Sequence, residues 1–244
     1  DYLIDVLGFD YGDLPDNDLP GSYPTNITNG SGEGGGACHL FKPGLKIGNN
    51  IDFEANGQPG ALANGDDTNG SPDDEDGIAS FPQFVVGKSA TVVVNVMNMQ
   101  TPAAAATLYG FIDWNKDGDF NDANESVTAN VPNGANGPIN LTFNVPLSAV
   151  LNMDLGARFR LTTAFVTAED CAPDGEVEDY MVQAIAFDWG DLPDNNLTGS
   201  YPTNETDGAG EGVGASHRYY PTLKMGTALD YEGDGQSSAL ANGD

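Results

Sequence analysis

Basic residues are scarce in this sequence of 244 residues, which has 8 Lys and Arg against 37 Asp and Glu and a formal net charge of −29. Such a polyanion repels phosphate and lacks the basic stripe that nucleic-acid binding needs, so this class is excluded. Histidine is also scarce, because His39 and His217 are the only two, and no HExxH or GxSxG motif is present. Recognisable catalytic motifs are therefore missing, and we expect no enzymatic activity.

Long apolar runs and metal-type cysteine motifs are missing as well. No run approaches the roughly 20 apolar residues of a membrane-spanning helix, so we expect no membrane span. Cys38 and Cys171 lie 133 positions apart with no CxxC pattern, which excludes a cysteine metal motif. The two are a disulfide candidate, and the sequence leaves open whether they are bonded. Gly and Pro are plentiful at 32 and 15, and the apolar residues form short runs, which favours strands and turns over coiled coils.

The sequence repeats itself at an offset of 178 residues. FDYGDLPDNDLPGSYPTN at residues 9–26 returns as FDWGDLPDNNLTGSYPTN at residues 187–204. Residues 1–66 align without a gap onto residues 179–244, with more than half of the aligned positions identical. We infer a tandem array with a unit of 178 residues, of which this sequence is a window.

This period predicts four segments. They are the last strand of a preceding unit at residues 1–8, a loop-rich acidic segment at 9–76, a β-sandwich at 77–186 and the start of the next unit at 187–244. The loop-rich segment is dominated by Gly, Asn, Asp and Pro, and we expect short strands there only near Leu45–Ile47 and Ile51–Phe53. Such a segment needs something other than a hydrophobic core to order it.

From Ile78 onward the pattern becomes that of β-strands. Apolar and polar residues alternate in stretches such as LTFNV and RFRLTTAF, which suits strands with one face on a core and one in water. Strands are expected at residues 89–99, 107–114, 139–146, 157–166 and 177–187. With polar turns between them, they predict an all-β fold, namely an antiparallel β-sandwich of the jelly-roll or immunoglobulin-like kind.

The stretch DWNKDGDFNDANE carries the strongest metal-binding signal. Oxygen side chains at the first, third and fifth positions of a tight turn, followed by a Gly that permits the bend, are what Ca²⁺ requires. The stretch departs from an EF-hand because its twelfth position is Asn124, and its flanks TLYGFID and ESVTA have the pattern of strands. We therefore expect a calcium-binding turn between two strands, with a solvated hairpin as the alternative. The candidate ligands are Asp113, Asn115, Asp117, Asp119, Asp122 and Glu125.

Two further groups of carboxylates are candidate calcium ligands. In GDDTNGSPDDEDG, acidic side chains repel one another unless cations neutralise them or the segment stays solvated, and both outcomes remain open. This group comprises Asp66, Asp67, Asp73, Asp74, Glu75 and Asp76. The repeated motif D-[YW]-G-D-L-P-D is compatible with either a metal site or a fixed turn geometry. It supplies Asp10, Asp13 and Asp16 and, one period later, Asp188, Asp191 and Asp194.

Several stretches resemble one known family. GEVEDY at residues 175–180, GARFRLT at residues 156–162 and the DWNKDGDFNDANE turn are similar to the GEVED domain of secreted and cell-surface bacterial proteins. The upstream FDYGDLPD and GDDTNGSPDDEDG motifs resemble the segment that often precedes this domain, so the resemblance spans essentially the whole unit. It implies an extracellular β-rich module of large repetitive or adhesin-like proteins, with no enzymatic activity of its own.

The carboxylates that give the family its name are here Glu176, Glu178 and Asp179. Strand alternation places Glu176 and Glu178 on one face with Tyr180, which argues against a wholly exposed face. We expect Glu176 and Glu178 to pair with Arg158 or Arg160, or to bind a nearby cation.

The leading functional hypothesis is an extracellular structural or adhesive protein whose tandem units form a surface stalk or filament stiffened by Ca²⁺. Bound Ca²⁺ would cancel part of the negative charge and crosslink acidic loops. The expected partners are neighbouring copies, joined covalently or by strand exchange, with surface glycans or other cells as further candidates. One alternative is a calcium-dependent carbohydrate- or protein-binding module that presents Tyr219, Tyr220, Trp114 or Trp189. Another is a passive spacer for an adhesin or enzyme domain elsewhere in the chain.

Overall fold

The computed structural model describes residues 8–17, 19, 21–27, 35–65, 74–195, 197, 200–206 and 213–243. All the regular elements in these ranges are β-strands, which confirms the all-β class. Residues 1–7 of the strand segment expected at residues 1–8 lie outside the described ranges. The strands are β1 Phe9–Tyr11, β2 Cys38–Leu40, β3 Leu45–Ile47, β4 Phe84–Val85, β5 Ser89–Asn98, β6 Ala106–Ile112, β7 Ser126–Val131, β8 Ala135–Asn144, β9 Leu155–Thr162, β10 Cys171–Ala172, β11 Glu176–Val182, β12 Ala184–Ile185, β13 Phe187–Trp189 and β14 Ser216–Arg218.

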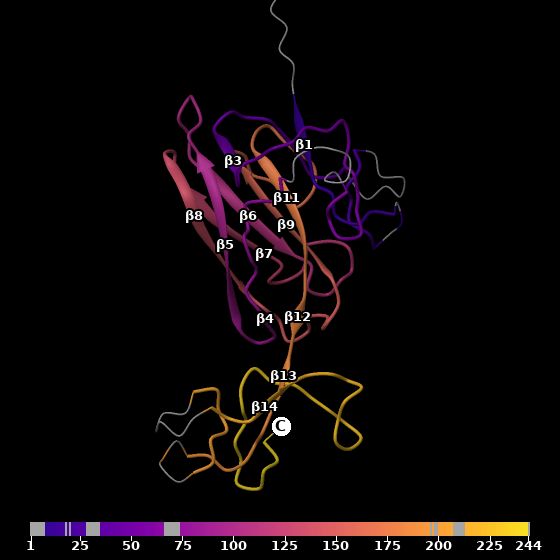
Figure 1. Cartoon of the computed structure of the whole chain (residues 1–244), viewed down its shortest axis with the longest axis vertical. Helices are drawn as coiled ribbons and strands as arrows, with labels where there is room; N and C mark the ends of the chain where they lie inside the picture. Colours follow the sequence, from indigo (N-terminus) through magenta and orange to yellow (C-terminus); the bar gives the residue numbers. More distant parts are fainter. Residues whose placement is uncertain are drawn as a thin grey trace, which may run out of the picture. The chain divides into compact units, whose positions relative to one another are not determined.

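Two facing sheets form the β-sandwich (Figure 1). The larger is antiparallel with strand order β11-β9-β6-β7, and the smaller has the order β3-β5-β8. Along β5 buried and exposed residues alternate, as expected for a strand with one face on the core. By contrast, every residue of β9 is buried, so the larger sheet is covered on both faces.

The core between the sheets is closely packed. Trp114 and Phe143 meet at nearly a right angle, with ring centroids 6.2 Å apart, and both are buried. Gly110 lies where a Cβ would come within 2.8 Å of the Leu141 side chain and 2.9 Å of the Phe143 side chain, so a larger residue at this point of β6 would displace both. The close packing of the core therefore limits the size of the side chain at individual positions.

The outer face of the larger sheet is covered by the loop-rich segment. Leu14 and Tyr23 from this segment pack with Tyr109, Phe111 and Phe120 in one buried cluster. Beside them β1 pairs antiparallel with β2, and β2 pairs parallel with β10. A disulfide between Cys38 and Cys171 joins β2 to β10. The loop-rich segment is thus ordered by the sandwich on which it lies.

The strands differ from the predicted ones in several places. Residues 51–53 form no strand, and the N–H of Asp52 donates to the Asp74 side chain instead of entering a ladder. β9 stops at Thr162 because Asp174 accepts hydrogen bonds from the backbone N–H of Thr163 and from both threonine hydroxyls. The stretch expected as one strand at residues 177–187 is divided among β11, β12 and β13.

The chain divides into two compact units. One comprises Asp1–Pro82, Thr91–Phe143 and Asp154–Val182, and contains the sandwich and the first copy of the repeat. The other comprises Gln83–Ala90, Asn144–Met153 and Gln183–Asp244. In the second unit β12 pairs parallel with β4, and β13 pairs antiparallel with β14.

Candidate functional site

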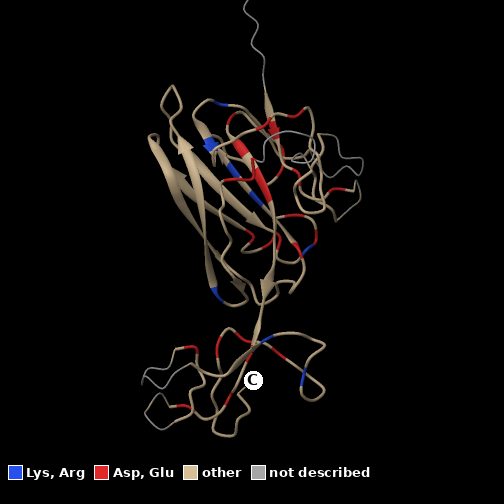
Figure 2. Cartoon of the chain, viewed as in Figure 1, with Lys and Arg blue, Asp and Glu red and all other residues tan. Residues whose placement is uncertain are grey.

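The candidate site is built around β11. This strand pairs with β9 so that Asp179 lies opposite Arg158 and Val177 lies opposite Arg160. Cross-strand partners point to the same face, so these side chains share the outer face, and Glu176 and Glu178 point to the inner face. Figure 2 shows the acidic stretch of β11 beside basic positions of β9.

Asp179 and Arg158 form a bidentate ion pair that is fully buried. Arg158 Nε donates to Asp179 Oδ1 at 2.7 Å, and Nη2 donates to Oδ2 at 2.7 Å. Asp179 Oδ2 also accepts the backbone N–H groups of Asp13 at 2.8 Å and Leu14 at 3.0 Å. The pair therefore holds the loop-rich segment on the sheet. This corrects the expectation that Glu176 or Glu178 pairs with Arg158, because the register places Asp179 on the arginine face.

Arg160 is bound by neutral acceptors. Its Nε donates to His39 Nε2 at 2.9 Å, and its Nη1 donates to the carbonyls of Thr167 and Glu169 at 2.7 Å. His39 Nδ1 donates to Asp174 O at 2.8 Å, which leaves Nε2 free to accept. Burial and the charge of Arg160 hold the pKa of His39 well below its usual range, so the imidazole is neutral. The expected pairing of Arg160 with Glu176 or Glu178 is thus also corrected.

The inner-face glutamates accept backbone N–H groups. Glu178 Oε1 accepts from Gly77 at 2.9 Å and from Asp76 at 3.2 Å, and its Oε2 accepts the Tyr180 hydroxyl at 2.9 Å. Glu176 Oε2 accepts the N–H of Ile47. Burial raises the pKa of Glu178 to about 8. Burial, followed by the charge of Asp10, raises the pKa of Glu176 well above its usual value.

A second feature is a group of three buried carboxylates, called here the carboxylate cluster: Asp10, Asp52 and Asp74. Each contributes one oxygen, and these oxygens lie within 4.8 Å of one another. Asp10 belongs to β1, Asp52 follows β3, and Asp74 precedes β4, so three segments distant in sequence meet here. Calcium ligands lie about 2.3–2.6 Å from the ion, so the oxygens of one site are at most about 5 Å apart. The carboxylate cluster meets this condition.

Several oxygens at the carboxylate cluster accept no hydrogen bond from any described residue. They are Asp10 Oδ1, both oxygens of Asp52 and the neighbouring Glu176 Oε1. Burying an ionised carboxylate without a partner is costly. Burial and the adjacent Asp74, Glu54 and Asp52 raise the pKa of Asp10 well above its usual value. The excess of negative charge therefore favours the binding of a cation or of protons by these carboxylates. Because all the candidate ligand atoms are oxygens, the cation that they suit is Ca²⁺.

The same arrangement recurs one period later. Asp188, Asp230 and Glu232 also bring one carboxylate oxygen each to within 4.8 Å of the others. Asp188 and Asp230 are the counterparts of Asp10 and Asp52, and Glu232 is the counterpart of Glu54. This second group is more accessible, since Asp188 is half-buried and Asp230 is exposed.

One protein-family model matches a large part of the β-sandwich. Residues 107–183, which run from β6 through β11, match the model of the GEVED domain. This segment is a GEVED domain. Its presence indicates a surface or secreted module of the repeat type. No curated protein and no solved structure matches the chain. Across the described ranges, no helix is long and apolar enough to cross a membrane.

Within the GEVED domain, the turn after β6 is folded by its own carboxylates. Asp113 Oδ1 accepts the N–H of Lys116 at 2.6 Å, and Oδ2 accepts from Gly118 at 3.0 Å and from the Tyr23 hydroxyl at 2.8 Å. Glu125 accepts the N–H groups of Trp114 at 2.9 Å and Asp122 at 3.0 Å. Burial raises the pKa of Glu125 to about 7.

The remaining turn residues also contact one another. Asn115 Nδ2 donates to Asp117 Oδ2 at 2.9 Å and to Asp122 Oδ2 at 2.5 Å, and Asp119 Oδ1 accepts the N–H of Asn121 at 2.8 Å. These contacts account for the shape of the turn without an ion, so calcium at this turn of the GEVED domain stays a prediction.

The other acidic residues of the D-[YW]-G-D-L-P-D motif accept backbone N–H groups in both copies. Asp13 accepts from Gly65 at 2.7 Å, and its counterpart Asp191 accepts from Gly243 at 3.0 Å. Asp16 and Asp194 accept from Thr25 at 3.1 Å and Thr203 at 3.2 Å. In the GDDTNGSPDDEDG stretch, Asp76 accepts the N–H of Asn49 at 2.5 Å and Glu75 is half-buried. Asp66, Asp67 and Asp73 lie outside the described residues.

Sequence reasoning missed Asp52, its counterpart Asp230 and Glu232 as candidate ligands. The signal was present, because Asp-Phe-Glu at residues 52–54 recurs as Asp-Tyr-Glu at residues 230–232. An isolated Asp outside an acidic run carries little weight by itself, and only the fold brings it to Asp10.

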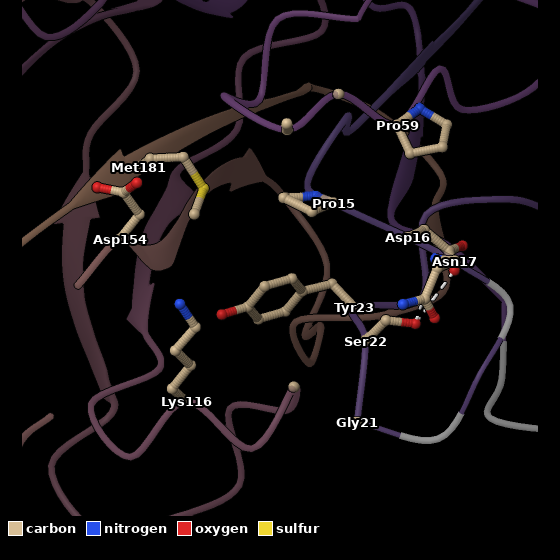
Figure 3. Close-up of a pocket in the computed structure, with 13 residues that line it drawn as sticks. Pro15, Asp16, Asn17, Gly21, Ser22, Tyr23, Pro59, Lys116, Asp154 and Met181 are labelled. Carbon is tan, nitrogen blue, oxygen red and sulfur yellow. Dashed lines mark hydrogen bonds between the residues drawn. The ribbon is translucent and has the colours of Figure 1, made fainter.

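A separate hollow of about 470 Å³ lies between the loop-rich segment and the GEVED domain turn. Figure 3 shows the Lys116 amino group and the Tyr23 hydroxyl on its wall, with Asp154 and Met181 opposite Pro59. The Tyr23 hydroxyl is engaged, since it donates to Asp113 and accepts the N–H of Gly156 at 2.9 Å. The lining of this hollow includes no member of the carboxylate cluster.

Proposed function

We propose that this chain is a calcium-stabilised structural module of a secreted or cell-surface repeat protein. The observation that carries the proposal is the carboxylate cluster of Asp10, Asp52 and Asp74, whose members are all buried. The role is mechanical rather than catalytic, because the buried acidic groups connect segments of the chain.

The physical argument rests on charge. A buried group of like charges is stable only if the carboxylates take up protons or a cation neutralises them. Ca²⁺ is the cation that this donor set favours, because carboxylate oxygens are hard ligands and no nitrogen or sulfur ligand belongs to the carboxylate cluster. A bound ion would link β1, the loop after β3 and the residues before β4, and so would hold together three distant parts of the loop-rich segment.

Repetition extends this role along a surface structure. A tandem array of such units would form a stalk or filament, in which calcium stiffens every acidic segment. The second group, Asp188, Asp230 and Glu232, supports this extension because it recreates most of the carboxylate cluster in the next copy. Adhesion would follow from the surface that the array displays.

The first experiment is thermal unfolding of the full chain in chelator and in a calcium titration. At a calcium concentration 100 times the dissociation constant, binding would stabilise the chain by about 2.7 kcal/mol, which raises the melting temperature by about 5–10 °C for a protein of this size. Asp52→Asn should lose most of this increase. In chelator the same variant should melt above the wild type, because the amide removes one of three crowded charges.

Two control variants locate the ion. Asp154→Asn changes a surface carboxylate outside both candidate sites and should keep the full calcium response. Asp117→Asn alters the turn after β6 and should also keep it if the carboxylate cluster is the site. A calcium response that survives Asp52→Asn and disappears in Asp117→Asn would move the ion to the turn. An equal melting temperature in chelator and calcium would remove the calcium role altogether.

A binding module is the second candidate. Trp114 and Trp189 are buried, which removes them from an exposed ligand face. Tyr219 and Tyr220 do line a hollow of about 540 Å³, which is large enough for a sugar residue. A glycan array probed with the full chain in calcium tests this role, and binding that Tyr220→Ala abolishes would favour it over the structural one.

A further inference from the structure

The two copies of the repeated segment share a strand pairing and several internal hydrogen bonds. The pair β13–β14 repeats the register of β1–β2, since Asp188 lies opposite His217 as Asp10 lies opposite His39. The Thr203 hydroxyl donates to Leu192 O at 2.8 Å, as the Thr25 hydroxyl donates to Leu14 O at 2.8 Å. Around this hairpin the second copy therefore has the conformation that the first copy has when it lies on the GEVED domain.

The copies differ in what covers them. Leu14, Tyr23 and Ile47 are 0%, 6% and 0% exposed, whereas their counterparts Leu192, Tyr201 and Met225 are 47%, 57% and 96% exposed. In the first copy, Leu14 and Tyr23 pack on the outer face of the larger sheet, and Ile47 pairs with β5. The exposed side chains of the second copy are thus the counterparts of those that the sandwich buries.

The hollow beside the second copy marks the same contact surface. It is about 540 Å³, and Asp188, His217 and Met225 line it. At the matching positions of the first copy, Asp10 Oδ2 accepts the N–H of Val177 at 2.7 Å, His39 accepts from Arg160 Nε, and Ile47 N donates to Glu176. Where the first copy receives β9 and β11, the second copy has a hollow.

We propose that Leu192, Tyr201 and the hollow lined by Asp188, His217 and Met225 form the docking surface for a second GEVED sandwich, which binds through its own β9 and β11. Asp188 would accept the N–H that corresponds to Val177, and His217 would accept from the arginine that corresponds to Arg160. Leu192 and Tyr201 would cover the outer sheet face. This contact would form without a disulfide, because the counterpart of Cys38 in the second copy is Ser216. The inference deepens the proposed structural role by naming the partner of one unit, and it does not depend on calcium.

The test extends the full chain by a second copy of residues 67–186, which supplies the sandwich at its place in the 178-residue period. Amide hydrogen exchange of residues 213–231 is measured in the original and the extended chain. Docking should slow exchange of these amides at least tenfold and should protect Tyr201 from hydroxyl-radical labelling. Both should hold in chelator as well as in calcium, which separates this inference from the calcium role.

The matched control carries Leu192→Asp and Tyr201→Ala, two substitutions at exposed positions of the second copy. In the original chain they should leave exchange unchanged, and in the extended chain they should abolish the added protection. Unchanged exchange in an extended chain whose added sandwich has its own protected amides would overturn the inference. Glycan binding at Tyr220 that the added sandwich leaves undiminished would also overturn it.

Discussion

At the scale of the residue, the side chains of the GEVED motif accept hydrogen bonds from the backbone of other segments. Gly175 has φ +104°, and a Cβ there would lie 1.7 Å from Leu161 O. Glu176, Glu178 and Asp179 each accept N–H groups from the loop-rich segment or from the residues that follow it. The motif therefore serves as an anchor for other parts of the chain.

Gly175→Ala should destabilise the chain by about 3 kcal/mol or more, because positive φ and a backbone clash act together. Gly134→Ala is the matched control, since its φ is +93° and nothing lies within 4 Å of the added Cβ. It should cost only about 1 kcal/mol. Urea unfolding measures both, and equal losses would contradict the clash.

Arg158→Met should cost about 3–5 kcal/mol, because it leaves the buried carboxylate of Asp179 without its counter-charge. Arg218→Met is the control at an exposed arginine and should change stability by about 0.5 kcal/mol or less. Adding Asp179→Leu to Arg158→Met should recover part of the loss. If the double variant is less stable than the sum of the single variants, the ion pair is not the source of the effect.

At the scale of the element, the short sheet β1-β2-β10 joins the loop-rich segment to the GEVED domain. Its strands have only two or three residues each, which is too few for independent stability. The disulfide between Cys38 and Cys171 reinforces it across a separation of 133 residues. In the second copy the hairpin β13–β14 forms the same register with Ser216 in place of cysteine.

Replacing Cys38 and Cys171 together by Ser should lower stability by about 2–5 kcal/mol and keep the fold, because the bond mainly restricts the unfolded chain. Thermal unfolding with and without reductant measures the effect. Reductant should lower the melting temperature of the wild type and leave that of the double variant unchanged. A double variant without cooperative unfolding would show that the bond is needed to form the native state.

At the scale of the whole molecule, the same segment occurs twice in different surroundings. Thr25 and Thr203 follow identical Ser-Tyr-Pro sequences, and their N–H groups donate to Asp16 and Asp194 at 3.1 and 3.2 Å. The first copy is additionally held by the sandwich, the Arg158–Asp179 pair and the disulfide. Local opening should therefore differ although the local structure is the same.

We expect the Thr203 amide to exchange with solvent at least tenfold faster than the Thr25 amide in the full chain. The two have matched neighbours and matched hydrogen bonds, so the comparison isolates the surrounding contacts. Hydrogen exchange followed by nuclear magnetic resonance measures both rates in one sample. Equal rates would mean that the segment is stable by itself, and that the sandwich adds little to it.

Much of the fold was accessible from local pattern. The strand patterns at residues 89–99 and 157–166 predicted β5 and β9, and the flanks of the DWNKDGDFNDANE turn predicted β6 and β7. The small strands β1, β2 and β10 escaped prediction, because two or three residues carry no periodic signal. The expected strand at residues 51–53 is absent, and there the N–H of Asp52 donates to the side chain of Asp74 rather than to a neighbouring strand.

The sequence by itself determined the all-β class, the period of 178 residues and the GEVED resemblance, because these depend on local pattern and self-similarity. Only the tertiary structure decided which carboxylates meet. Asp10, Asp52 and Asp74 are brought together by strand pairing and loop packing, and the register of β11 on β9 gives Arg158 to Asp179. It also decided that one copy of the repeat is buried and the other exposed, since burial depends on what packs against a segment and not on its own sequence.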